Sequence, residues 1–125
     1  MTSLTSRQVA ERRGRRSEWL ASLLLVLKGY RILSRRARTH AGEIDLVARS
    51  PLGVVCFIEV KARRVARDAI ESLKPRQQAR IARAAELYLA ARPGLAKRGV
   101  RFDMITVSPG GWPQHVRDAW RPNNS

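Results

Sequence analysis

GEIDLVAR at residues 42–49 and VVCFIEVK at residues 54–61 are two largely apolar runs, separated by the sequence SPLG at residues 50–53. Both runs are rich in residues that favour extended strands. The proline and the glycine of the short connection favour a tight reversal of the chain. The sequence therefore predicts an antiparallel β-hairpin, with strands at 43–49 and 54–61.

Acidic residues interrupt both predicted strands. Successive side chains of a strand point to opposite faces, so Phe57, Glu59 and Lys61 share one face of the second strand. The hairpin brings Asp45 of the first strand close to Glu59. Ionised groups in such apolar strands are unfavourable unless they are paired or bind a metal ion. The pattern therefore predicts a site that contains Asp45, Glu59 and Lys61.

Two carboxylates form an all-oxygen site, which suits Mg²⁺ or Mn²⁺ better than zinc. A lysine beside them can orient water and stabilise the charge that develops on a phosphate. Asp45, Glu59 and Lys61 therefore predict metal-assisted hydrolysis of phosphodiesters. Two structural alternatives stay open: an edge-strand ion pair between Glu59 and Lys61, and pairing of Asp45 with Arg49 or with the arginines at 35–38.

Further elements follow on both sides of the hairpin. Leucines at 20, 23, 24 and 27 recur with helical spacing, Ser6 is a suitable N-cap and Gly29 a suitable C′ residue. A second helix is expected to begin at Pro75. The predicted elements are a helix at 6–28, a short strand at 30–34, a basic loop at 35–40, the hairpin, a loop at 63–70, a helix at 75–91, a strand at 100–107, a turn at 108–114 and a short last element at 116–120. This αβββαβ order predicts a mixed α/β fold in a single domain, with short flexible ends at 1–5 and 121–125.

The chain carries 25 Lys and Arg but only 10 Asp and Glu, for a formal net charge of +15. Residues 1–40 carry a net +8 and residues 71–125 a net +6, whereas residues 41–70 carry only +1. A charge of this size favours a polyanionic partner, and nucleic acid, most simply DNA, ranks ahead of an anionic membrane. The candidate contacts are Arg36, Arg38, Arg76, Arg80 and Arg83, although a solvated helix face would explain the last three equally well.

The single cysteine, Cys56, cannot form an intramolecular disulfide, which favours the reducing cytoplasm. Basic residues at 7–16 before an apolar run at 19–27 resemble a signal peptide, but KGYR at 28–31 does not fit a cleavage site. The apolar run is also too short to span a bilayer. The sequence therefore predicts a cytoplasmic protein; a peripheral membrane anchor at 7–27 is the lowest-ranked alternative.

Other residues with chemical potential receive structural interpretations. Cys56 is expected to be a buried small hydrophobe. Asp103 stands in an apolar strand and is expected to pair with an arginine. His115, like His40, is expected at the surface or facing phosphate, and Trp112 and Trp120 are expected to pack rather than to stack on bases.

GEIDLVA at 42–48 together with FIEVKAR at 57–63 resembles the YraN-like family of uncharacterised proteins. That family is similar to the archaeal Holliday-junction resolvases within the PD-(D/E)XK nuclease superfamily. The resemblance covers roughly residues 14–120. It continues in Gly14…Glu18-x-x-Ala21, Gly29-Tyr30-x-Ile32-Leu33, Arg101-Phe102-Asp103-Met104-Ile105 and His115…Ala119-Trp120.

The resemblance implies a restriction-endonuclease-like core and assigns roles by position. Asp45 and Glu59 would be metal ligands, and Lys61 the catalytic lysine. Glu18 would be an outer or second-metal carboxylate. Lys74 and Arg76 would contact phosphate, and a homodimer is implied by analogy. The sequence departs from the family pattern at Ser17, where glycine is expected, and at Ala62, where a hydroxyl residue is expected.

Two functional hypotheses follow. The first is a Mg²⁺- or Mn²⁺-dependent endonuclease that acts on DNA, including branched or otherwise structured DNA. The second is a DNA-binding or DNA-processing accessory protein that keeps the nuclease fold without cleavage. The two differ in whether Asp45 and Lys61 are needed for a chemical step.

Overall fold

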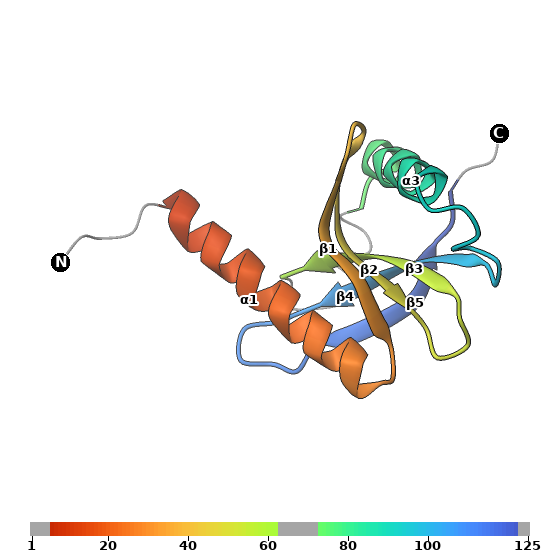
Figure 1. Ribbon diagram of the computed structural model, residues 1–125. Helices are drawn as coiled ribbons and strands as arrows, with labels where there is room; N and C mark the ends of the chain where they lie inside the picture. Colours follow the sequence, from red (N-terminus) through yellow and green to blue (C-terminus); the bar gives the residue numbers. More distant parts are fainter. Residues whose placement is uncertain (1–5, 63–72, 123–125) are drawn as a thin grey trace.

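The computed structural model describes residues 6–62 and 73–122, with side chains from residue 14 onward. The elements in these ranges are α1 (Ser6–Leu27), β1 (Arg31–Thr39), β2 (Gly42–Arg49), β3 (Val55–Lys61), α3 (Pro75–Ala90), β4 (Val100–Thr106) and β5 (Gln114–Trp120). The strands form one sheet in the order β1-β2-β3-β4-β5 (Figure 1). Strands β3 and β4 are parallel, and the other neighbours are antiparallel.

This architecture confirms the predicted mixed α/β fold, and its order agrees with a restriction-endonuclease-like core. The last predicted element is a full strand, β5, which pairs with β4. The predicted loop at 63–70 lies outside the described residues. So do the predicted flexible ends, apart from Arg121 and Pro122.

Helix α1 ends as the sequence predicts. Gly29 has φ 86°, and the amides of Gly29 and Tyr30 donate to the carbonyls of Val26 and Leu25 at 3.0 and 2.9 Å. This is a Schellman ending, which satisfies carbonyls that have no partner in the helix. The buried face differs from the predicted leucine stripe, because Leu27 is 66% exposed and the helix instead lays Ala21 and Leu25 on the sheet.

The predicted basic loop at 35–40 is wrong, because β1 continues through it to Thr39. The antiparallel pairing with β2 runs to Thr39 and Gly42, so the β2 backbone supplies hydrogen bonds to these arginine-rich residues. Strand β1 is also an edge strand of the sheet. Exposed charged side chains are common on edge strands, where they discourage pairing with other chains.

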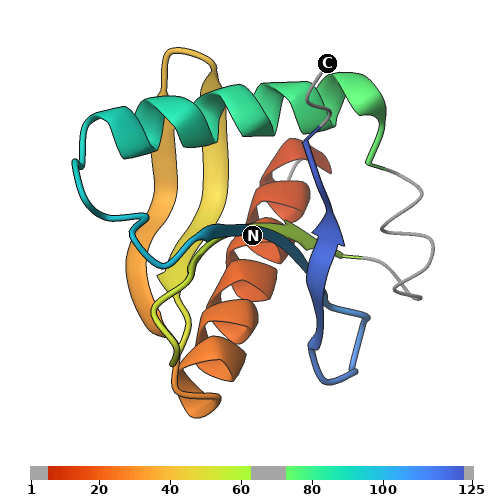
Figure 2. The ribbon, with the colours of Figure 1, turned by 90° about the vertical axis from the view of Figure 1, so that its right-hand side faces the viewer.

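Two apolar cores lie on opposite faces of the sheet. One joins α3 to the strands through Ile81, Ala85 and Tyr88, which pack with Phe57 and Phe102 among others. The other joins α1 to the opposite face and includes buried residues at 46, 48, 56, 58 and 105. Figure 2 shows α3 crossing the β1–β2 hairpin while α1 lies on the other side of the sheet. The central strand β3 is therefore covered on both faces.

Helix α3 begins at Pro75, as predicted, and buries Ile81, Ala84, Ala85 and Tyr88. It lies in the connection between the parallel strands β3 and β4, where a helical crossover is expected. Arg76, Arg80 and Arg83 are exposed, as their spacing predicted. The helix thus buries one face against the sheet and presents a basic face outward.

Burial of Cys56 leads to a test of the fold. Its thiol lies in β3 beneath α1 with no exposed surface, and burial, with a further contribution from the charge of Asp103, raises the pKa of the thiol to about 12. Because the thiolate is the reactive form, we expect no labelling by iodoacetamide at pH 8 in the folded protein and complete labelling in denaturant, measured by mass spectrometry. Rapid labelling of the folded protein would contradict this packing.

Candidate active site

Strands β2 and β3 separate before they end. Their pairing extends from Arg49 and Val55 to Leu46 and Ile58 and stops there. Beyond that point β2 continues only alongside β1, and β3 only alongside β4. The next pair in register would be Asp45 and Glu59. We call the place where the strands separate, with Asp45, Glu59 and Lys61, the β2–β3 fork.

The side chain of Asp45 takes over a backbone interaction at the fork. Its Oδ2 accepts a hydrogen bond of 2.8 Å from the Val60 amide. Among the described residues, no ion pair joins Asp45 to Arg49 or to the arginines at 35–38, so that alternative is not what the structure shows. Asp45 instead fixes the separated strands to each other.

Glu59 is 8% exposed and hydrogen-bonds to the Asp45 carboxyl group. Burial, followed by this hydrogen bond and the negative charge of Asp45, raises the pKa of Glu59 to about 9. Two carboxyl groups can share a hydrogen bond only when one of them carries a proton. A raised pKa of this kind favours a protonated carboxyl group within the pair.

The carboxyl pair of Asp45 and Glu59 could hold a divalent cation, because a cation can replace the proton of such a pair. Two carboxylates, completed by water and phosphate oxygens, match the preference of Mg²⁺ for hard ligands. Within the described residues, no group of three or more His, Cys, Asp or Glu side chains converges. The candidate cation site therefore consists of Asp45 and Glu59.

Two cationic side chains face the fork. Lys61 follows Glu59 on the same strand face, and the positive charges of Lys61 and Arg80 oppose the rise in the pKa of Glu59. Arg80 comes from α3 and lies against Gly42 at the beginning of β2. A methyl group added at Gly42 would lie 3.3 Å from Arg80 Cδ. Sequence reasoning placed Arg80 among the nucleic-acid contacts but did not connect it to the carboxylates.

Glu18 reaches the same level of the sheet through Arg36. The pairs Arg35–Leu46 and Ala37–Ile44 flank Arg36, so Arg36 stands opposite Asp45. Arg36 Nε donates a 2.7 Å hydrogen bond to Glu18 Oε2, and this contact raises the pKa of Arg36, with smaller contributions from the charges of Glu43 and Asp45. Glu18 thus pairs across to β1 and not with its own helix.

Arg36 adopts an unusual backbone conformation beside the fork. Its φ of 50° lies in the left-handed region, which costs a non-glycine residue roughly 1–3 kcal/mol. The Glu18 ion pair helps to offset this cost. The strained Arg36 backbone and the Arg36–Glu18 ion pair thus lie opposite Asp45, at the position where the pairing of β2 with β3 stops.

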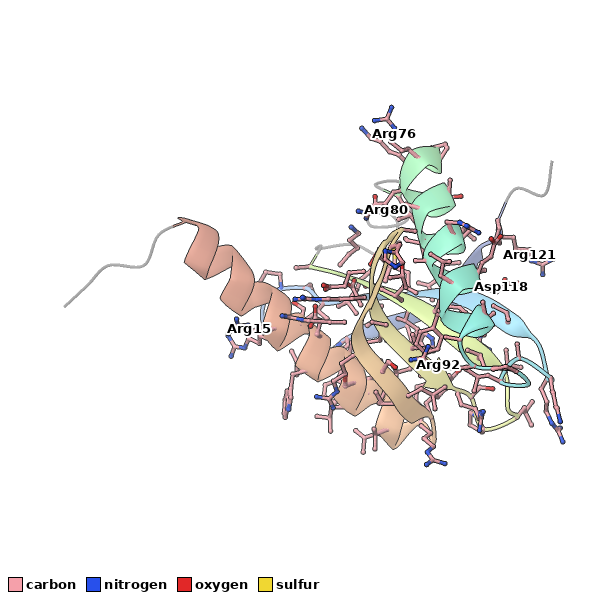
Figure 3. All side chains as sticks on the ribbon, turned by 45° about the horizontal axis from the view of Figure 1, so that its top comes forward. Arg15, Arg76, Arg80, Arg92, Asp118 and Arg121 are labelled. Carbon is pink, nitrogen blue, oxygen red and sulfur yellow. The ribbon has the colours of Figure 1, made fainter. Side chains whose placement is uncertain are left out.

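The remaining predicted nucleic-acid contacts are exposed at the surface. Lys74 and Arg76 are exposed at the N-terminal end of α3, where Figure 3 shows Arg76 projecting outward. Arg83 pairs with Glu86 at 3.0 Å, and Arg38, whose side chain is 89% exposed, lies 3.8 Å from Glu43. These residues are therefore exposed cations, and within the described part of the chain no hydrogen bond or ion pair joins them to the fork.

A second polar cluster lies on the α1 side of the sheet around Asp103, which has no exposed surface. Arg101 donates two hydrogen bonds to its carboxylate at 2.7 and 2.8 Å and a third to the Tyr30 hydroxyl at 2.7 Å. The predicted pairing of Asp103 with an arginine is therefore confirmed. His115 Nε2 and the Asp118 amide also bond to Asp103, at 2.7 and 3.0 Å.

The prediction for His115 is wrong: its side chain is 2% exposed. Lys28 Nζ lies 2.7 Å from Nδ1, so with a protonated Lys28 the other ring nitrogen carries the hydrogen donated to Asp103. The cluster ties β5 and the end of α1 to β4. Trp120 packs on Phe102 at a ring-centroid distance of 4.4 Å, as predicted, whereas Trp112 is 61% exposed.

These observations define a class of protein: a mixed five-stranded sheet between two helices, with a carboxylate pair and a lysine where two strands separate. The profile of the uncharacterised protein family UPF0102 matches residues 17–107. A UPF0102 protein of Maricaulis maris is 54% identical over 96% of this chain and 94% of its own length, and one of Mesorhizobium japonicum is 49% identical over 95% and 94%. The chain belongs to the UPF0102 family, which confirms the predicted YraN-like relationship.

No helix in the described part of the chain is both long enough and apolar enough to cross a membrane.

The Asp103 cluster predicts a pH-dependent contribution to stability. Burial alone would raise the pKa of Asp103, but the hydrogen bonds from Arg101, His115 and the Asp118 amide outweigh it and lower the pKa from 3.8 to about 2. Because the pKa of Asp103 is lower in the folded protein, its ionised carboxylate stabilises the fold above pH 3.8, and this stabilisation is lost as the pH falls towards 2. The contribution to the free energy of unfolding is roughly 2 kcal/mol at pH 6 and about half of that at pH 3.

We therefore expect Asp103→Asn to lower the free energy of unfolding by roughly 2–4 kcal/mol at pH 6, since Arg101 would lose its buried partner, and by clearly less at pH 3. Urea unfolding at the two pH values measures the difference. Glu86→Gln, on the exposed face of α3, is the control. An equal loss for Asp103→Asn at both pH values would contradict the assignment.

Proposed function

We propose that this protein is a metal-dependent endonuclease that hydrolyses DNA phosphodiesters at the β2–β3 fork. The observation that carries the proposal is the placement of Asp45 and Glu59, the next pair in register, beside Lys61 at the point where two strands separate. The net charge of +15 supports a polyanionic substrate. The resemblance to junction resolvases supports branched DNA as the substrate and a homodimer as the assembly.

The fork residues have distinct proposed roles. Asp45 and Glu59 would hold Mg²⁺ or Mn²⁺, with the proton between them released on binding. The bound cation would polarise the phosphate and activate water. Lys61 would orient the attacking water and stabilise the negative charge that develops on phosphate oxygens. Arg80, at the side of the fork, would bind a phosphate oxygen and position the substrate.

Glu18 and the two departures from the family pattern affect this proposal differently. Glu18 is neutralised by Arg36, so its proposed role as an outer carboxylate requires that Arg36 turn to a phosphate instead. Ser17 is buried in α1 and is accommodated there. Ala62 brings no hydroxyl group next to Lys61, so the lysine would act without that neighbour. We place the protein in the cytoplasm, where its single thiol and its substrate would both be found.

A second candidate function is DNA binding without cleavage. It is favoured by one feature of the structure: both acidic groups near Asp45 are satisfied without a cation, Glu59 by its proton and Glu18 by Arg36. An accessory protein that keeps the fold would need no more than this. The two functions differ in their need for the fork residues.

Cleavage tests the first function directly. We expect wild-type protein with Mg²⁺ or Mn²⁺ to cut labelled duplex, flap or four-way-junction DNA, and EDTA to abolish cutting. Asp45→Asn and Lys61→Ala should each slow cleavage about 100-fold or more, because positioned groups of this kind contribute that much. Glu86→Gln should cleave normally. Cleavage that is unchanged in both fork variants would eliminate the catalytic proposal.

Metal binding can be tested without activity. We expect Mn²⁺ to bind the wild type in calorimetry and to give an anomalous peak between Asp45 and Glu59 in soaked crystals. Glu59→Gln preserves the shape and the hydrogen bond of the protonated carboxyl group, so it should fold normally yet bind Mn²⁺ at least about tenfold more weakly. Equal Mn²⁺ affinity in both proteins would place the cation elsewhere.

A further inference from the structure

A basic groove lies between β1 and the C-terminal half of α3, with a volume of about 450 Å³. We call it the β1–α3 groove and define it by Arg35, Arg38 and His40 on the β1 side and Tyr88 and Arg92 on the α3 side. None of the ten residues that line it, all within the described ranges, is acidic. Three arginines around one hollow repel one another, and a bound anion would relieve that repulsion.

On the α3 side of the groove, Arg92 and Tyr88 are held by several contacts. The Arg92 guanidinium lies 3.6 Å from the centre of the Tyr88 ring and donates a 3.1 Å hydrogen bond to the Tyr88 carbonyl. The Tyr88 hydroxyl in turn bonds to Ser34 on β1 at 2.7 Å. A guanidinium has five N–H donors in one plane, so one bond to the backbone orients the group without exhausting its donors. Arg92 is therefore a positioned cation.

The β1 side of the groove adds two cations that are weakly engaged. Arg38 has a side chain that is 89% exposed and lies 3.8 Å from Glu43, too far for a hydrogen bond. Arg35 is exposed as well. Arg36, between them in sequence, instead pairs with Glu18. Arg35 and Arg38 of β1 therefore line the groove, whereas Arg36 of the same strand lies beside the fork, opposite Asp45.

Helix α3 links the groove to the fork. Arg80 lies beside Gly42 near the fork, and Arg92 follows the C-terminal end of the helix (Figure 3). Twelve residues separate them, which corresponds to roughly 18 Å along a helix axis. The phosphates of one DNA strand rise about 3.4 Å each, so one backbone could reach both places within several nucleotides.

We propose that the β1–α3 groove binds a backbone phosphate of the nucleic acid whose reacting phosphate lies at the β2–β3 fork. The proposal rests on the proposed function for the identity of the ligand, and on the groove itself for its chemistry. The ligand class is a phosphate oxyanion, which planar guanidinium groups recognise well. A nucleic-acid strand and a small phosphorylated molecule share this chemistry, and the proposal commits to the strand.

The experiment is DNA binding in EDTA, so that the fork chemistry plays no part. Fluorescence anisotropy of a labelled duplex and a labelled single strand would be measured between 50 and 200 mM salt. The test variant is Arg35→Gln with Arg38→Gln, two exposed positions that should leave folding intact, and Arg92→Gln is a second variant. The matched control is Arg98→Gln with Arg121→Gln, which removes the same charge from exposed positions away from the groove.

We expect each lost duplex phosphate contact to weaken binding about 8-fold at 0.1 M salt and to reduce the salt slope by about 0.9. The control pair should change both quantities much less. If the groove variants lose no more affinity than the control, the groove proposal is overturned. That result would leave the proposed function standing, provided that the wild type cleaves and Asp45→Asn does not.

Two further results separate the possible causes of failure. If wild-type protein shows no salt-dependent DNA binding, the proposed function fails together with the groove. If inorganic phosphate or a mononucleotide shifts the Tyr88 and His40 NMR signals while the groove variant binds DNA normally, the groove holds a small phosphorylated molecule and the assignment to nucleic acid is overturned. Shifts of the same signals by DNA, lost in the groove variant, would support it.

Discussion

The hydrogen bond between the Val60 amide and the Asp45 carboxylate is the contact on which the fork depends. An unpaired backbone amide between two apolar cores would be costly, and separation of β2 from β3 creates such an amide. Asp45 supplies the acceptor that the neighbouring strand no longer provides. The same carboxyl group then meets Glu59, so one residue both permits the strands to separate and forms half of the acidic pair. The same carboxyl group of Asp45 therefore has both a structural role and a proposed chemical role.

Charge is distributed in this molecule according to how each group can be solvated or paired. The buried and half-buried acidic groups are each satisfied by a partner: Glu59 by Asp45, Glu18 by Arg36, and Asp103 by Arg101, His115 and the Asp118 amide. Most arginines of β1 and α3 remain exposed, where water solvates them and where a polyanion would find them. The net positive charge thus surrounds the fork, while the cluster around Asp103 consolidates the opposite side of the sheet.

Much of this arrangement follows from local patterns. The hairpin, the two helices and the shared face of Glu59 and Lys61 follow from periodicity and turn residues, because these depend on near neighbours in the chain. The predicted length of β1 was wrong, because its arginine-rich second half favours a loop locally and becomes a strand only through pairing with β2. The burial of His115 had no local signal either, because its partners Asp103 and Lys28 are 12 and 87 residues away in sequence.

The sequence by itself determined the α/β order, the family, and the two carboxylates with their lysine, because strand periodicity and residue chemistry are written locally. Only the tertiary structure decided that β2 and β3 separate at Asp45, that Arg36 joins Glu18 to that row, and that α3 brings Arg80 to the fork and Arg92 to the groove. These outcomes depend on sheet register and on helix packing across two cores. Such long-range geometry is chosen by the free energy of the whole fold, which no short stretch of sequence records.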